Sequence, residues 1–138
     1  MGYQQTKDAL EKSLKRLGTD YLDIYLIHWP RPSDLNAEWR ELDVETWKAL
    51  EDLYKSKKVR AIGVSNFLPH HLNNLLERTS ITPMVNQLEF HPGYIQKAAV
   101  DFCKQMGIQI EAWSPIGRAR VLKEPFLMEL AEKYQVSV

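Results

Sequence analysis

The feature that most constrains the fold of this chain is a fourfold alternation of β-rich runs with segments of helical spacing. The runs lie near 23–28, 59–64 and 83–88 and from 108 onwards, and each is followed by a segment of helical character. Strands that alternate strictly with helices are parallel and joined by right-handed crossovers, with helices covering the sheet. The pattern predicts an α/β fold of about four parallel strands, and an open doubly wound sheet and a (β/α) barrel both fit it.

Length adds a second constraint. A complete barrel of this type takes about 250 residues, and the chain has 138. We therefore expect a single domain over residues 1–138 that supplies only about half of the units of such a barrel.

Five helices are predicted from apolar periodicity and from residues that start or stop helices. The first spans about 3–17 and precedes the first strand, whereas each of the others follows a strand. Asp43 is placed as the cap of the second helix, and Glu51 is expected to pair with Lys55 on its exposed side. Residues 31–40 show no clear period and are interpreted as a loop over the strand ends. The second helix buries a stripe formed by Val44, Trp47, Leu50, Leu53 and Tyr54.

Composition gives no support to several classes of function. Eighteen basic and eighteen acidic residues cancel, so no electrostatic reason exists to expect nucleic acid or an anionic membrane as a partner. No apolar run approaches the roughly 20 residues that span a bilayer, and residues 1–5 do not resemble a signal peptide, so a cytoplasmic location is expected. The single cysteine, Cys103, cannot form an internal disulfide and is expected to be a buried core thiol.

Polar or aromatic side chains follow each predicted strand. His28 and Trp29 come after the first, Ser65 and Asn66 after the second, Gln87 and Glu89 lie at the end of the third, and Trp113 ends the fourth. Ligands of open α/β sheets and of barrels bind at the carboxyl ends of the strands. The sequence therefore predicts one site, built from several strand ends.

Four segments carry a resemblance to a known family. Residues 20–30 (DYLDIYLIHWP), 63–67 (GVSNF), 86–92 (NQLEFHP) and 112–117 (AWSPIG) closely resemble the aldo-keto reductases, in the order that the family has them. The likeness covers nearly the whole chain and is closer to the soluble reductases than to potassium-channel β subunits. It implies a (β/α)₈ barrel and NADPH-dependent reduction of aldehydes or ketones to alcohols, with this chain forming the part from the third to the seventh helix.

The resemblance assigns one catalytic residue and leaves three without a match. His28 matches the family's catalytic histidine, whereas the catalytic tyrosine, aspartate and lysine belong to elements that precede these residues in the family. None of the six tyrosines lies in an Asp-Thr-Ala-x-x-Tyr context, and the motif for the adenosine 2′-phosphate is absent. The chain alone is therefore expected to be inactive. The alternative is a non-catalytic, self-associating half-barrel module or fragment.

The substrate side of the site is expected to depend on His28 and Trp29. A neutral imidazole at a strand end can donate a hydrogen bond to a substrate carbonyl oxygen, where negative charge develops during reduction. Trp29 is expected to shape the pocket for a small carbonyl compound. A histidine that merely caps a strand is the structural alternative for His28.

The cofactor side is expected to hold the nicotinamide of NADPH. A carboxamide offers one carbonyl and one NH₂, which suit the hydroxyl and the two amides of Ser65, Asn66 and Gln87. Trp113 can stack on the nicotinamide face, and Ser114 can bond the pyrophosphate. The structural alternatives are a Ser-Asn turn, a buried amide and a tryptophan that fills the barrel mouth.

No metal is expected, and a homodimer is possible. His28 and His91 lack a local ligand cluster, and the rings of His70 and His71 are expected to point about 100° apart on a helix. A four-stranded parallel half barrel leaves two unpaired edges. Two copies joined about a two-fold axis can close an eight-stranded barrel.

Overall fold

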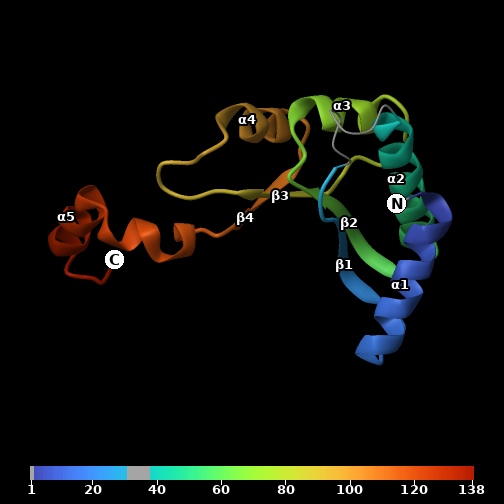
Figure 1. Ribbon diagram of the computed structural model, residues 1–138, viewed down its shortest axis with the longest axis horizontal. Coiled ribbons are helices and arrows are strands. Elements are labelled where there is room, and N and C mark those ends of the chain that lie inside the picture. The colour runs from blue at the N-terminus through green and yellow to red at the C-terminus, as the bar shows by residue number, and fades with distance from the viewer. Residues whose placement is uncertain (1, 31–37) are drawn as a thin grey trace.

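A computed structural model describes residues 2–30 and 38–138 of the chain. Helices and strands alternate along it, as the sequence predicts (Figure 1). The elements are α1 (Tyr3–Leu17), β1 (Leu22–Ile27), α2 (Trp39–Lys55), β2 (Val59–Ser65), α3 (Pro69–Leu76), β3 (Val85–Glu89), α4 (Lys97–Gln105), β4 (Gln109–Trp113), the 3₁₀ segment η1 (Gly117–Lys123) and α5 (Pro125–Tyr134). The loop predicted over 31–40 lies mostly outside the described residues, and its last two residues belong to α2.

The four strands form one parallel sheet in the order β1-β2-β3-β4. This confirms the predicted α/β fold with four parallel strands. Within the described residues β1 and β4 each pair with a single neighbour, so each has one free edge. The helices α1 to α4 lie along one side of the curved sheet, as in part of a barrel wall (Figure 1).

The core lies between the sheet and these helices. It contains fully buried side chains of α2, β2, α3 and α4, among them Trp47, Ile62, Leu72 and Cys103. The predicted stripe of α2 is buried apart from Tyr54, which is partly buried, and Cys103 is the expected core thiol. Burial of this apolar face is the main force that holds the helices on the sheet.

Two expectations for α2 are wrong. The helix begins at Trp39, so Asp43 lies inside it and is not its cap; Trp39 packs edge-on against His71, with 5.3 Å between ring centroids, and this contact anchors the additional turn. Glu51 is not on the exposed side either. Its carboxylate is buried and accepts hydrogen bonds from the backbone N–H groups of Ser80 and Ile81, at 2.7 and 2.6 Å.

The other face of the sheet is the concave face of the partial barrel. In parallel register Leu26 lies opposite Gly63, and Gly63 lies opposite Val85. Further along the same face Ser65 lies opposite Gln87 and Gln87 opposite Glu111. This face changes from apolar to polar towards the carboxyl ends of the strands.

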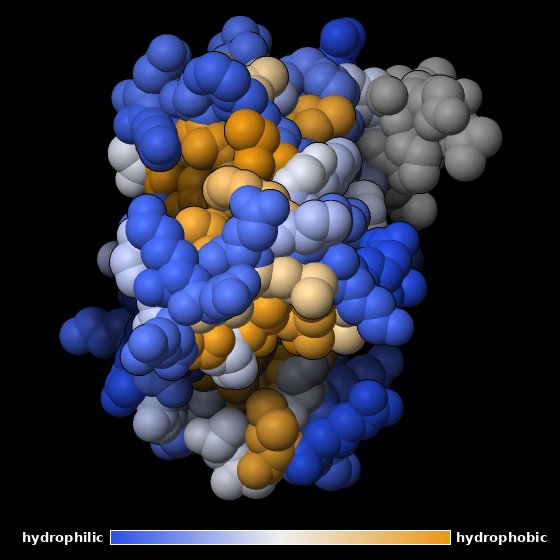
Figure 2. All heavy atoms as spheres, turned by 90° about the vertical axis from the view of Figure 1, so that its left-hand side faces the viewer, coloured by the Kyte–Doolittle hydropathy of each residue, from blue (hydrophilic) through white to orange (hydrophobic). Residues whose placement is uncertain are grey.

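The helix α5 is set apart from the rest of the fold (Figure 1). None of its residues is buried, and its main contact within the described residues is with η1. Figure 2 faces this side of the molecule and shows apolar side chains gathered between hydrophilic ones. The exposed large apolar residues of this carboxyl-terminal part are Phe126, Met128, Tyr134, Val136 and Val138. Across residues 2–30 and 38–138, no helix combines the length and apolarity needed to cross a bilayer.

Candidate active site

A cavity of about 280 Å³ lies at the carboxyl ends of the four strands. It joins the end of β1 to those of β2, β3 and β4, which is where parallel strands present their last side chains. Six of the seven residues that the sequence assigns to substrate or cofactor surround it. They are His28, Trp29, Ser65, Asn66, Gln87 and Trp113.

Asn66 joins the strand ends to one another. Its Nδ2 donates hydrogen bonds to the backbone oxygen of His28 (2.9 Å) and to the hydroxyl of Ser65 (3.0 Å). Its Oδ1 accepts the indole N–H of Trp113 at 2.9 Å. Asn66 has φ 64°, a left-handed conformation that asparagine tolerates better than most residues. This turn aims the amide across the ends of β1, β2 and β4.

Ser65 and Gln87 differ in how their polar atoms are used. Ser65 is buried, and its hydroxyl donates to the backbone oxygen of Gln87 at 2.8 Å. The side-chain amide of Gln87 makes no hydrogen bond with any of the described residues, although it borders the cavity. Gln87 therefore offers a free donor and a free acceptor, whereas Ser65 keeps only its acceptor capacity.

His28 offers its imidazole to the same cavity. The side chain is exposed and makes no hydrogen bond with the described part of the chain; its ring lies 6.3 Å from that of Trp29. The backbone of His28 is fixed instead, through its bond to Asn66. Both ring nitrogens are thus available to a ligand.

The end of β4 places Trp113 and Ser114 differently. Trp113 is partly buried and borders the cavity with its indole, which its bond to Asn66 holds in place. Ser114 does not border the cavity; its φ is 50°, and its backbone oxygen accepts the N–H of Gly117 at 2.7 Å. The chain therefore turns out of the sheet at Ser114.

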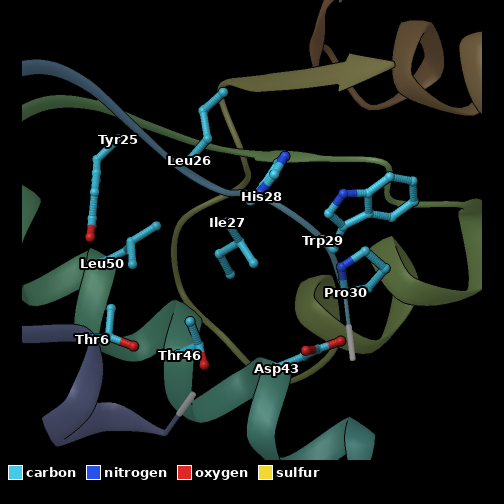
Figure 3. Close-up of a pocket in the computed structure, with 10 residues that line it drawn as sticks. All are labelled: Thr6, Tyr25, Leu26, Ile27, His28, Trp29, Pro30, Asp43, Thr46 and Leu50. Carbon is cyan, nitrogen blue, oxygen red and sulfur yellow. The ribbon is translucent and has the colours of Figure 1, made fainter. Parts of the chain in front are cut away.

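A larger cavity, of about 580 Å³, lies beside β1 on the side of the helices (Figure 3). Tyr25 and Leu50 face it from β1 and α2, Thr6 and Thr46 approach from the helices below, and His28 stands at its upper rim. Burial raises the pKa of the Tyr25 hydroxyl. This cavity lies along the free edge of β1. The sequence does not predict it.

Histidines elsewhere depart from the sequence-based expectation. The rings of His70 and His71 do not diverge, since their centroids are 3.8 Å apart. Both rings pack on Trp39, which brings them together. His91 lies 3.5 Å from a carboxylate oxygen of Glu89. A group of three or more potential metal-binding side chains does not occur within the described ranges.

A parallel sheet with outer helices and a cavity lined by polar and aromatic side chains at the strand ends defines a partial (β/α) barrel, with its candidate site where barrel enzymes have theirs. The family model of the Aldo/keto reductase family matches residues 1–126. The chain belongs to that family.

Individual relatives agree over almost the whole chain. Glyoxal reductase of Bacillus subtilis (strain 168) is 53% identical over 137 residues, which cover 99% of this chain and 47% of the relative. The crystal structure of an aldo/keto reductase from Brucella melitensis superposes with a TM-score of 0.90 at 43% identity, covering 99% of this chain and 50% of that one. A mutant of Gox0644 in complex with NADPH gives a TM-score of 0.88 at 42% identity, covering 97% and 47%. The chain thus spans about half the length of the relatives it matches.

Proposed function

We propose that this chain forms the carbonyl-orienting and nicotinamide-binding part of an NADPH-dependent aldo-keto reductase that reduces aldehydes or ketones to alcohols. The observation that carries the proposal is the convergence of His28, Asn66, Gln87 and Trp113 on one cavity at the strand ends. Family membership and the NADPH complex of a relative support it. In this proposal the chain corresponds to the barrel from its third to its seventh helix, and the reductase acts in the cytoplasm.

The groups around the cavity fit a nicotinamide carboxamide. Gln87 offers a free NH₂ and a free carbonyl oxygen, and the second lone pair of the Asn66 Oδ1 can accept from a ligand NH₂. The fixed indole of Trp113 presents an apolar face beside them. In the proposed roles Ser65 supports this group, and Ser114 contacts the pyrophosphate from outside the cavity. When bound, NADPH supplies the hydride.

His28 orients the substrate in this proposal. Its imidazole N–H donates to the carbonyl oxygen, which gains negative charge as the carbonyl carbon is reduced. The exposed ring of Trp29 covers the substrate on the side of β1.

Proton delivery is the step for which the described residues provide no group. A tyrosine acts as the acid when a nearby cation lowers its pKa. Tyr25 lies in β1, but burial raises the pKa of its hydroxyl, and it faces the larger cavity on the side of the helices. We therefore propose that the isolated chain does not turn over.

Titration of NADPH with tryptophan fluorescence tests cofactor binding. Because the motif for the adenosine phosphate is absent from the sequence, the dissociation constant should lie in the millimolar range, about −4 kcal/mol. Trp113→Phe should abolish the quenching, and Trp39→Phe, which removes a tryptophan that does not border this cavity, is the control that should preserve it. Binding unaffected by Trp113→Phe contradicts the site.

An activity assay tests the catalytic part of the proposal. Glyoxal is the substrate to use, because a relative is a glyoxal reductase. NADPH oxidation by the purified chain should equal the uncatalysed rate. A turnover that His28→Ala abolishes would show that the chain is catalytic alone.

We also propose that the chain associates with a second copy. The free edges of β1 and β4, the cavity beside β1 and the uncovered apolar residues of α5 all offer surfaces for another chain. Light scattering should give a mass of at least twice 16.1 kDa. A monomer that melts cooperatively rules the association out.

A further inference from the structure

The turn after β2 is held to β3 on both sides of Asn66. The backbone N–H of Asn66 donates to the backbone oxygen of Gln87 at 2.9 Å. The next N–H along the chain, that of Phe67, donates to the side-chain Oδ1 of Asn86 at 3.4 Å. The two peptide groups that flank the Asn66 Cα are thus both bonded to consecutive residues of β3, and their orientation defines its left-handed conformation.

Asn86 is fully buried on the helix side of the sheet, facing away from the cavity. Besides accepting from Phe67, it donates from Nδ2 to the backbone oxygen of Phe67 at 2.8 Å, and Nδ2 lies 3.4 Å from the sulfur of Cys103. The last Cα pair of β2 and β3 is Ser65 and Gln87, and the backbone N–H of Asn66 makes the last backbone hydrogen bond to β3. The Asn86 amide therefore replaces that pairing for one more residue.

The hydrogen bonds of Asn86 lie in the buried core. Phe67 and Cys103 are both fully buried, and the Phe67 ring packs on His71 with 5.7 Å between centroids. Loss of the Asn86 amide would leave two buried backbone groups of Phe67 without partners. The turn would then be free to move the Asn66 side chain away from His28 and Trp113.

We propose that Asn86 is a positioning residue, which holds the turn at Asn66 and so sets where the Asn66 amide meets the indole of Trp113. The ligand role of this arrangement rests on the proposed function, whereas the positioning rests on the hydrogen bonds alone. Asn86 touches neither substrate nor cofactor in this proposal.

The indole N–H resonance of Trp113 in an NMR spectrum of the whole chain reports the positioning directly. Asn86→Ala should shift this resonance to the position that it has in Asn66→Ala, and exchange of its proton with solvent should become roughly tenfold faster. Asn74→Ala is the matched control. It removes another buried asparagine amide, which donates to the backbone oxygen of Arg40 at 3.0 Å, and should leave the Trp113 resonance unchanged.

A folded Asn86→Ala protein with an unchanged Trp113 resonance overturns the proposal. Where Asn86→Ala does not fold, the wild-type chain decides: slow exchange of the Asn86 side-chain NH₂ and of the Phe67 N–H supports the proposal, and exchange at the rate of free amides overturns it. NADPH titration of the same samples separates the two levels. Wild-type protein that binds no NADPH refutes the proposed function and leaves the indole result to decide the role of Asn86.

Discussion

The indole N–H of Trp113, at the end of β4, donates a hydrogen bond of 2.9 Å to the side-chain oxygen of Asn66, which follows β2. The two residues are 47 positions apart in the chain, and β3 lies between their strands. This bond therefore spans the mouth of the partial barrel. The geometry of the site therefore depends on correct pairing of β2, β3 and β4.

Replacement of Asn66 should destabilise the fold as well as the site. Asn66→Ala removes three side-chain hydrogen bonds and places alanine at φ 64°. We expect a loss of about 2–3 kcal/mol in the free energy of unfolding. Asn66→Gly removes the same bonds without the backbone strain, and should lose about 1 kcal/mol less. Urea unfolding of the two variants measures the difference; equal losses would show that the left-handed turn carries no strain.

Glu51 should contribute to stability through its bonds to the loop after α3. Its buried carboxylate accepts two backbone N–H groups, those of Ser80 and Ile81. Glu51→Ala leaves both donors unpaired, and a loss of about 2–4 kcal/mol is expected in urea unfolding. The exposed Glu129 on α5 is the control, since Glu129→Ala should change stability by less than about 0.5 kcal/mol. Similar values for the two variants would mean that water replaces the carboxylate.

Gly63 is required for close packing rather than for its backbone conformation. A Cβ at this position would lie 2.6 Å from the backbone oxygen of Val85 and 2.8 Å from a methyl carbon of Leu26. Gly63→Ala should destabilise the chain by about 2 kcal/mol or more. Gly107→Ala is the comparison, because Gly107 has φ 70° but open space around it, and only about 1 kcal/mol of strain is expected. If thermal unfolding shows that Gly63→Ala destabilises the chain less than Gly107→Ala does, the strands can move apart enough to accommodate the added methyl group.

The sequence predicts the alternation of strands and helices, and the meeting of the strand ends, better than it predicts contacts between distant segments. His28, Asn66 and Trp113 come together as expected because the carboxyl ends of parallel strands meet at one edge of the sheet. The sequence predicts Glu51 on the exposed side, because helical periodicity carries no information on the loop 29 residues further along the chain that covers it. Ser114 falls outside the cavity because its left-handed conformation turns the chain away, and a serine gives little local signal for that.

The sequence also does not predict how the side chains of the adjacent residues His70 and His71 pack. Helical geometry separates adjacent residues by about 100°, yet the rings of His70 and His71 approach one another because both pack on Trp39. Trp39 belongs to the turn of α2 that precedes Asp43, where the sequence placed the start of the helix. Because the predicted helix begins at Asp43, the sequence does not indicate that Trp39 packs on both histidines.

His71 should make the stability of the chain depend on pH. The side chain is buried, and its Nδ1 accepts the backbone N–H of Leu68 at 3.1 Å, which requires the neutral ring. Burial, and to a lesser extent the neighbouring His70, lowers the pKa of His71 from its usual 6.5 to about 4. The unfolded chain therefore takes up a proton as the pH falls below 6.5, whereas the folded chain does so only near pH 4.

The free energy of unfolding should thus be constant above pH 6.5 with respect to this group, and should fall by up to about 3 kcal/mol between pH 6.5 and about 4. His71→Asn keeps an acceptor for the Leu68 N–H but does not titrate in this range, so its stability should lack that decrease. Urea unfolding at intervals of pH compares the two proteins. Parallel curves for wild type and His71→Asn between pH 6.5 and 4 would show that His71 is protonated in the folded chain as readily as in the unfolded one.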